Sequence, residues 1–394
     1  MSSSPLPLVP DGVIYLDGNS LGPPSERTRE RVRALVDEEW GRDLIASWNA
    51  HGWIDMPQRL GGMIAPIIGA APDEVIVADS VSVNLFKLAA AALRAQRPRS
   101  VVVCEAEEFP TDGYILQGLA EFMPGVEVRA VPRASLAAAL TDDVALLLVS
   151  HVHYRTGELH DLADLTRRAH AAGAMVLADL SHSAGVIPTQ LSAWKVDMAT
   201  GCGYKYLNGG PGAPAFLYVA RRRQLWLRSP LTGWFGHARP FAFEGDYQPA
   251  EGMARWLCGT PPVLALAALE AGLEAYRLAD VRVLRAQSMA LTDLFIAEVE
   301  ARCEGHGLTL AGPREAARRG AQVGFHHPEA YSIVQALIEA GVVGDFRAPD
   351  IMRFGFAPLY VTGDQVREAA RRVGDVLDSR IWREARFQIR GAVT

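Results

Sequence analysis

Short apolar runs recur through the first part of the sequence, and they constrain the fold more than any other feature. Most are nearly continuous, and helical patterns such as that of residues 162–173 separate several of them. Strands with little alternation of apolar and polar residues, separated by helices, are typical of a mostly parallel sheet covered on both faces. Ligands bind such sheets at the carboxyl ends of the strands, so the residues that follow each run are candidates for a site. The predicted strands are 75–79, 101–104, 126–131, 144–150, 174–179 and 215–219.

The chain of 394 residues is longer than one small core requires, and its length predicts about two domains. A long helical region at 262–281 is expected to connect them. Beyond it, helices and strands are mixed, with a strand predicted at 323–327 and a last helix at 364–387. The fold class is therefore α/β. We predict an N-terminal segment 1–55 that packs with the small domain, a large site-bearing domain 56–285 and a small α+β C-terminal domain 286–394.

The composition of the chain argues against several classes of protein. The net charge of −6 and the lack of a dense basic run argue against a nucleic-acid partner. The four cysteines form no CxxC pair, which argues against a disulfide framework or a zinc site and fits a reducing compartment. The N-terminus does not resemble a signal peptide, and no apolar stretch is long enough to span a membrane. We therefore predict a cytoplasmic protein with no membrane partner.

A lysine lies between two tyrosines in the stretch GCGYKYLNGGPG, residues 201–212. The chain has only three lysines, so Lys205 is not a generic surface cation among the arginines. A lysine amine can attack a carbonyl and form a Schiff base. Asp179 ends an apolar run about 25 residues earlier, and this pair suits pyridoxal phosphate (PLP), whose ring nitrogen a carboxylate keeps protonated. On spacing alone, a solvated loop lysine and a turn-forming aspartate fit equally well.

Ser82 lies where a predicted strand passes into a helix, in the stretch DSVSVN. The N-terminus of that helix offers unpaired backbone N–H groups and the positive end of the helix dipole. This helix start is therefore a candidate phosphate cradle, with the Ser82 hydroxyl assisting. The alternative is that Ser80 or Ser82 only caps the helix, which needs no ligand.

Other site chemistries find less support. Neither a GxxxxGK[ST] nucleotide loop nor a GxGxxG dinucleotide motif is present, and a Ser-His-Asp hydrolase is disfavoured because GxSxG is absent. His151, His153 and His160 lie close in sequence, but no carboxylate lies at a helical spacing that would complete a metal site. We predict no metal.

Several motifs, taken in order along the chain, resemble the kynureninase family of PLP-dependent enzymes. Those most specific to the family within its fold are YLDGNSLG and YKYLNGGPG. One departure is Ser181, which stands where alanine is common, and we expect it to be harmless. The resemblance implies the aspartate aminotransferase-like fold (fold type I), with a large mostly parallel sheet of the seven-stranded type and a smaller C-terminal domain. The motifs are YLDGNSLGPP, SWNAHGW, FPTDGY, DLSHSAG, GCGYKYLNGGPG, LTGWFGHARPF, WLCGTPPV and MRFGFAPLY, spanning residues 15–360.

The resemblance also implies residue roles. Lys205 is expected to hold the cofactor covalently, and Asp179 to pair with its ring nitrogen. Tyr204 is expected to act in proton transfer, because the pKa of a phenol beside a cationic lysine can be shifted towards use; a plain phosphate hydrogen bond is the compatible alternative. The expected cofactor contacts are Val81, Ser82, Phe109, Asp112, Ser150, Asp179, His182, Tyr204, Lys205, Trp234 and Thr260, some of them reaching across from a second subunit.

Arg353 is expected to bind the substrate carboxylate, for which a planar, two-pronged cation has the right shape. Its position in MRFGF, between apolar neighbours, would make an unpaired guanidinium costly to bury. The other expected substrate contacts are Trp48, His51, Asn19 and Ser20, with Trp48, His51 and Thr260 facing the aromatic ring.

The implied activity is hydrolysis of L-kynurenine, or of 3-hydroxykynurenine, to anthranilate or its 3-hydroxy form and L-alanine, by a cytoplasmic homodimer with shared sites. The implied context is tryptophan catabolism and NAD biosynthesis. Three alternatives stay open: an enzyme acting on a substituted kynurenine in secondary metabolism, another lyase of the same fold such as a cysteine desulfurase using Cys303, and an inactive binding protein. Retention of Lys205, Asp179 and Arg353 together argues against the last.

Overall fold

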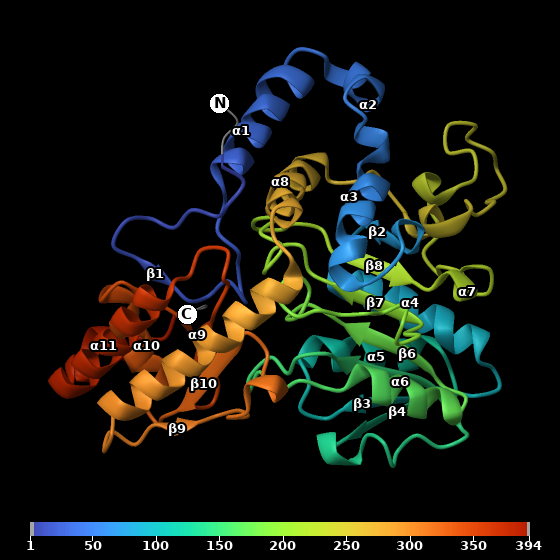
Figure 1. The fold of residues 1–394 in the computed structure, drawn as a ribbon. Coiled ribbons are helices and arrows are strands. Elements are labelled where there is room, and N and C mark those ends of the chain that lie inside the picture. Colours follow the sequence, from blue (N-terminus) through green and yellow to red (C-terminus); the bar gives the residue numbers. More distant parts are fainter. Residues whose placement is uncertain (1–3, 392–394) are drawn as a thin grey trace.

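The computed structural model describes residues 4–391, and a seven-stranded sheet forms its centre (Figure 1). The strand order is β2-β8-β7-β6-β5-β3-β4, and every neighbouring pair is parallel except the two that β8 makes. The predicted mostly parallel sheet is therefore confirmed. The strands are β2 (Val75–Val77), β3 (Val101–Glu105), β4 (Glu127–Val131), β5 (Val144–Ser150), β6 (Met175–Asp179), β7 (Met198–Gly201) and β8 (Phe216–Val219).

Both faces of this sheet are buried except at the edge strand β4, which explains why most of its strands read as continuous apolar runs. Successive residues of one strand belong to different core clusters: Val103 packs on one face, and Val102 and Cys104 pack on the other. Because neither face contacts water, no polar alternation is needed. The helices of this part of the chain are α3 (Met56–Ile64), α4 (Val81–Ala95), α5 (Pro110–Phe122), α6 (Leu162–Ala171), α7 (Arg221–Gln224) and α8 (Val263–Leu273).

Strand β7 is absent from the sequence-based prediction. Its sequence, MATG, is short and has a single β-branched residue, so it carries little intrinsic strand signal. Hydrogen bonding to β6 on one side and β8 on the other makes it a strand. This strand matters for the site, because it delivers the chain directly to residues 202–205.

The C-terminal part combines helices with a four-stranded antiparallel sheet of order β12-β13-β10-β9. Its apolar side chains form a core cluster separate from those of the large sheet, centred on Phe295, Phe325 and Phe354. The elements are α9 (Val281–Arg302), β9 (Thr309–Leu310), β10 (Gln322–His326), α10 (Ala330–Glu339), β11 (Val342–Val343), β12 (Asp345–Arg347), β13 (Ile351–Gly355), α11 (Gly363–Ser379) and α12 (Ala385–Gln388).

Two predicted helices are shorter than expected. The connector predicted at 262–281 ends as α8 at Leu273, and a 3-10 turn follows before Asp280 caps the start of α9. The helix predicted at 364–387 ends as α11 at Ser379, because Arg380 adopts a left-handed conformation with φ 54° that terminates it. Short local caps and turns therefore set boundaries that apolar periodicity does not reveal.

The N-terminal segment contacts both parts of the molecule. Strand β1 (Ile14–Tyr15) pairs in parallel with β11, while helix α1 (Glu26–Ala34) packs against α8, where Arg31 bridges to Glu270. A short helix α2 (Ser47–Ala50) precedes α3. Of the predicted segment 1–55, the described residues 4–55 thus contact the large sheet's helices as well as the C-terminal part. Within residues 4–391, no helix combines the length and apolarity that a membrane span requires.

Candidate active site

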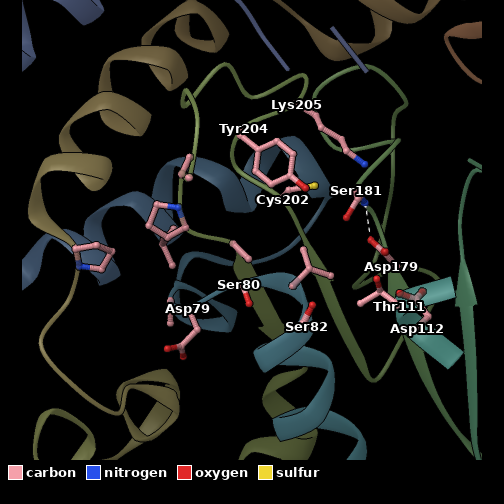
Figure 2. A pocket seen from close by; sticks show the side chains of 18 of the residues that line it. Asp79, Ser80, Ser82, Thr111, Asp112, Asp179, Ser181, Cys202, Tyr204 and Lys205 are labelled. Atoms are coloured by element: carbon pink, nitrogen blue, oxygen red, sulfur yellow. Dashed lines mark hydrogen bonds between the residues drawn. The ribbon is translucent and has the colours of Figure 1, made fainter. Parts of the chain in front are cut away.

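A cavity of about 670 Å³ opens at the carboxyl ends of the parallel strands (Figure 2). Ser150 and Asp179 end β5 and β6 in paired register, and the segment after β7 brings Lys205 to the same edge. The parallel sheet thus places residues from distant parts of the sequence side by side. Of the predicted site residues, those that line the cavity are Val81, Ser82, Phe109, Asp112, Ser150, Asp179, His182, Tyr204, Lys205 and Thr260.

The amine of Lys205 is oriented by a neighbouring histidine. Its Nζ lies 2.9 Å from Nε2 of His182, a side chain that is itself buried. Burial lowers the pKa of the His182 imidazole well below its usual value, and the nearby Lys205 charge lowers it further. A neutral ring accepts a hydrogen bond from the amine, so His182 holds Lys205 towards the cavity without adding charge.

Two buried carboxyl groups lie on one side of the cavity. Burial raises the pKa of Asp112 well above its usual value, with the neighbouring carboxylates of Asp179 and Glu108 adding to the shift. Burial also raises the pKa of Asp179, whose Oδ1 accepts a 2.7 Å hydrogen bond from the Ser181 backbone N–H. Both side-chain oxygens of Asp112 are buried without a hydrogen-bond partner. Unpaired buried acceptors are costly, so this side of the cavity is suited to a donor or a cation from a ligand.

The candidate phosphate cradle lies on another side of the cavity, at the start of α4 (Figure 2). Ser80 caps the helix, its hydroxyl accepting from the Val83 N–H at 3.3 Å, so the capping alternative is correct for Ser80. The N–H groups of Val81 and Ser82 precede the first intrahelical hydrogen bonds, as at any helix start. The cap therefore leaves the cradle available for an anion.

Tyr204 and Phe109 contribute aromatic rings to the cavity. Burial raises the pKa of the Tyr204 phenol, and Cys202 and Asp179 raise it further. This direction is opposite to the one expected for a phenol beside a lysine, and it keeps Tyr204 protonated as a hydrogen-bond donor. Phe109, directly before α5, packs edge-on against Tyr154 with ring centroids 5.4 Å apart.

Arg353 lies outside this cavity, on strand β13, with a side chain that is 1% exposed. Its guanidinium group is already paired with Asp345, whose carboxylate accepts from Nε at 2.8 Å and also from Nη2. Nη2 donates to Ser20 Oγ at 2.9 Å, and Nη1 donates to the Tyr154 carbonyl oxygen at 2.6 Å. With its amide oxygen turned to the guanidinium, Asn19 accepts from Nε at 3.1 Å. The predicted set of Arg353, Asn19 and Ser20 is thus brought together, around an internal carboxylate.

Besides Arg353, Asn19 and Ser20, three further predicted residues do not line the main cavity. Trp234 packs edge-on against Phe235, and the Trp48 ring packs on Trp53 and Phe235. His51 pairs with Asp43, at 2.6 Å between Nε2 and Oδ2. Thr260, by contrast, lines the cavity of its own chain. The roles of these four residues in binding cofactor or substrate stay predictions.

Other residues at the site are absent from the sequence-based prediction. Tyr154 lines both the main cavity and a neighbouring one of about 600 Å³, which also contacts Asp345 and Ser20. Its signal was its position four residues after the end of a predicted strand at Ser150. Cys202 also lines the main cavity, directly after the unpredicted β7. Asp345 has no sequence signal, because only the β12-β13 pairing brings it opposite Arg353.

Solved structures with the same overall fold belong to PLP-dependent enzymes. A cysteine desulfurase from Thermococcus onnurineus NA1 aligns with a TM-score of 0.78 at 17% identity, over 93% of this chain and 95% of its own. A C-DES mutant with glycine covalently linked to its PLP cofactor aligns with a TM-score of 0.79 at 19% identity, over 93% and 97%. The fold, with a lysine at the carboxyl edge of its sheet, is that of the fold type I PLP-dependent enzymes.

Sequence comparison narrows this class to one family. The kynureninase of Pseudomonas fluorescens is 49% identical over 98% of this chain and 94% of its own length. The kynureninase of Burkholderia mallei (strain SAVP1) is 47% identical over the same shares. Residues 284–373 match the kynureninase C-terminal domain model. The chain belongs to the kynureninase family.

Proposed function

We propose that this chain is a PLP-dependent hydrolase that cleaves the Cβ–Cγ bond of L-kynurenine, giving anthranilate and L-alanine. The observation that carries the proposal is the placement of Lys205: its amine faces a cavity with unpaired buried acceptors on one side and a free helix N-terminus on another. The reaction takes up one water. The hydroxyl of this water goes to Cγ, the ketone carbon attached to the aromatic ring, and a proton goes to Cβ.

The residues of the cavity fit PLP. Burial raises the pKa values of Asp112 and Asp179 and so disfavours their charged forms, and a protonated ring nitrogen would supply a compensating cation. The cradle at Val81 and Ser82 suits the phosphate, and Phe109 is the expected cover for the ring. When bound, PLP withdraws electrons from the substrate carbon chain and so permits carbon–carbon cleavage.

The chain's own groups perform the positioning and proton transfers. The Lys205 amine, oriented by neutral His182, is the base for the substrate Cα proton. Tyr204, kept protonated by its raised pKa, is the hydrogen-bond donor or acid beside it. Arg353 is the proposed anchor for the substrate carboxylate, so binding there must share or replace the Asp345 contacts.

A cysteine desulfurase activity is not favoured, although the fold is shared. That chemistry needs a mobile thiol, and the sequence suggested Cys303 as a loop candidate. The structure instead places Cys303 in the C-terminal core, and burial raises the pKa of its thiol to about 11. Two cysteines line the cavity. Cys202 is buried and directly follows β7. Cys258 is half-buried, its Sγ donates to the Leu231 carbonyl oxygen at 3.3 Å, and burial raises the pKa of its thiol, so it is not an activated nucleophile.

Steady-state kinetics test the proposed reaction and its substrate. We expect anthranilate and alanine to form from kynurenine in equal amounts, with a higher kcat/KM for kynurenine than for 3-hydroxykynurenine. The Trp48 and Thr260 residues motivate this preference, since the sequence favours a kynurenine-preferring enzyme. Sulfide or alanine release from cysteine, with no cleavage of either kynurenine, would refute the proposal in favour of a desulfurase.

We further propose a homodimer with shared sites, located in the cytoplasm and acting in tryptophan catabolism towards NAD biosynthesis. The loop region after α7 projects from the body of the molecule (Figure 1) and carries exposed apolar side chains, including Trp226 at 74% and Phe243 at 77% exposure. Exposed apolar patches of this kind mark interaction surfaces, and a second copy is the proposed partner. The four free cysteines fit a reducing compartment.

Mixing two inactive variants tests whether the sites are shared. Lys205→Ala and Trp234→Ala are each expected to be inactive when alone. If Trp234 serves the neighbouring site, a refolded equal mixture contains hybrids with one intact site, and roughly a quarter of wild-type activity returns. No recovery in the mixture, or full activity in a species that light scattering shows to be monomeric, would contradict the proposal.

A further inference from the structure

Lys87 is a buried cation that the proposed reaction does not use. Its side chain is 0% exposed, inside helix α4. The ammonium donates to Asp79 Oδ2 at 2.6 Å and to the Trp256 carbonyl oxygen at 2.7 Å. Lysine is almost never fully buried unless it is paired, so both contacts must compensate for lost hydration.

Both partners of Lys87 lead directly to the cavity. Asp79 lies immediately before Ser80, which caps the helix that carries the phosphate cradle. Its backbone has a positive φ of 51°, a conformation that a non-glycine residue keeps only when its surroundings hold it there. Trp256 lies immediately before the segment 257–262, all of which lines the cavity. One ammonium therefore ties together two sides of the site.

The negative charge of Asp79 lies where it would affect the binding of an anion in the cavity. Its carboxylate lines the cavity on the side of the cradle, away from Asp112 and Asp179 (Figure 2). A carboxylate near a bound phosphate repels it, and the repulsion is strong because the surroundings are partly buried. Lys87 cancels that charge from inside the protein, without reaching into the cavity itself.

We propose that Lys87 is a positioning residue for the phosphate group, because it neutralises the Asp79 carboxylate beside the phosphate cradle. The inference rests on the proposed PLP site. The competing explanation is an ordinary core ion pair that stabilises the fold and has no effect on phosphate. The two explanations differ in what happens when each partner of the pair is removed separately.

The test compares PLP with pyridoxal, which lacks the phosphate but reacts with the same lysine. Dissociation constants of both are measured on the full-length apoprotein of wild type, Lys87→Met, Asp79→Asn and the double variant. The ratio of the two constants isolates the phosphate contribution. Lys87→Met leaves the Asp79 charge facing the phosphate, and we expect the preference for PLP to fall by about tenfold or more.

Removing the Asp79 charge is expected to change the preference for PLP over pyridoxal in the opposite direction. Asp79→Asn should keep the preference for PLP or increase it, although it leaves a buried cation and lowers thermal stability. The double variant removes both charges and should return the ratio to within about threefold of wild type. Arg319→Met is the matched control: this arginine is also buried and ion-paired, with Asp293, but lies outside the cavity, so it should lower stability and leave the ratio unchanged.

Equal losses of PLP and pyridoxal affinity in Lys87→Met, or a weaker PLP preference in Asp79→Asn, would overturn the inference. If Lys87→Met does not fold, the Asp79→Asn and double variants decide by the same criterion. Failure of wild type to attach PLP at Lys205 would instead refute the proposed function. The two failures are therefore distinguishable.

Discussion

Replacing Lys205 with alanine is expected to remove both the covalent attachment of PLP and nearly all activity. The amine is the proposed attachment point and the proposed base for the Cα proton, and base catalysis alone typically contributes ~10²–10⁴-fold in rate. We expect kcat to fall by at least about 10³-fold, because both roles are lost together. Borohydride treatment followed by peptide mapping measures the attachment directly: wild type should carry the reduced cofactor on the peptide that contains Lys205.

The small number of lysines makes this test unambiguous. Only Lys87 and Lys195 compete with Lys205 as attachment points, and Lys87 is buried in the structure. Lys195 is exposed and serves as the matched control, so Lys195→Ala should keep the bound cofactor and wild-type kinetics. Reduced cofactor on a Lys195 peptide, or a Lys205→Ala variant that still turns over at a wild-type rate, would disprove the assignment.

Replacing Arg353 with alanine is expected to have two effects of similar size. If the guanidinium anchors the substrate carboxylate, its loss should raise KM for kynurenine strongly, since buried, hydrogen-bonded charge pairs typically contribute ~2–5 kcal/mol. The structure adds a second effect: Asp345 would be left buried without its main cationic partner. Breaking a buried pair costs about 3–5 kcal/mol of folding free energy, so the thermal midpoint should also fall. Arg353→Lys should restore little, because a point charge does not reproduce the two-pronged contact.

The stability effect and the binding effect are separable with a matched control. Arg319 is another buried arginine of the C-terminal part, paired with Asp293 and hydrogen-bonded to Thr292. Arg319→Ala should lower the thermal midpoint by a comparable amount and leave KM unchanged. The cofactor absorbance should persist in both variants, because neither side chain lines the main cavity. Near-normal kcat/KM in a folded Arg353→Ala variant would place the carboxylate site elsewhere, with Arg347 as the next candidate.

The contrast between Lys205 and Arg353 shows how far the site could be predicted. Asp179 ends β6, whose apolar run is legible in the sequence, and parallel strands present their carboxyl ends at one edge. Lys205 was singled out by its motif, but it follows β7, which has little strand signal, so only the pairing of β7 with its neighbours brings the lysine to that edge. The sequence predicted that Arg353 is buried and needs a partner for its guanidinium, but it did not indicate which residue of the chain that partner is. Asp345 precedes it by eight residues, and only the antiparallel pairing of β12 with β13 sets the two opposite each other.

The direction of the Tyr204 pKa shift was likewise decided by the tertiary structure. Sequence adjacency to Lys205 suggested a lowered pKa, but adjacent residues need not direct their side chains to the same place. Burial raises the pKa, and the neighbours Cys202 and Asp179 add to the effect. Desolvation depends on how many atoms surround a group, which is a property of the folded chain and not of a short motif.

By itself, then, the sequence determined the mostly parallel sheet and the family, and it singled out ten of the residues that line the cavity, because apolar runs and motif residues are local signals. The tertiary structure alone decided the short strand β7, the internal partner of Arg353 and the burial of Lys87 against Asp79 and Trp256. Each depends on pairing between segments that are distant or weakly patterned in sequence. Hydrogen bonding between strands and burial of side chains stabilise these contacts. Both contributions depend on which distant segments meet in the folded chain, so they cannot be read from a short stretch of sequence.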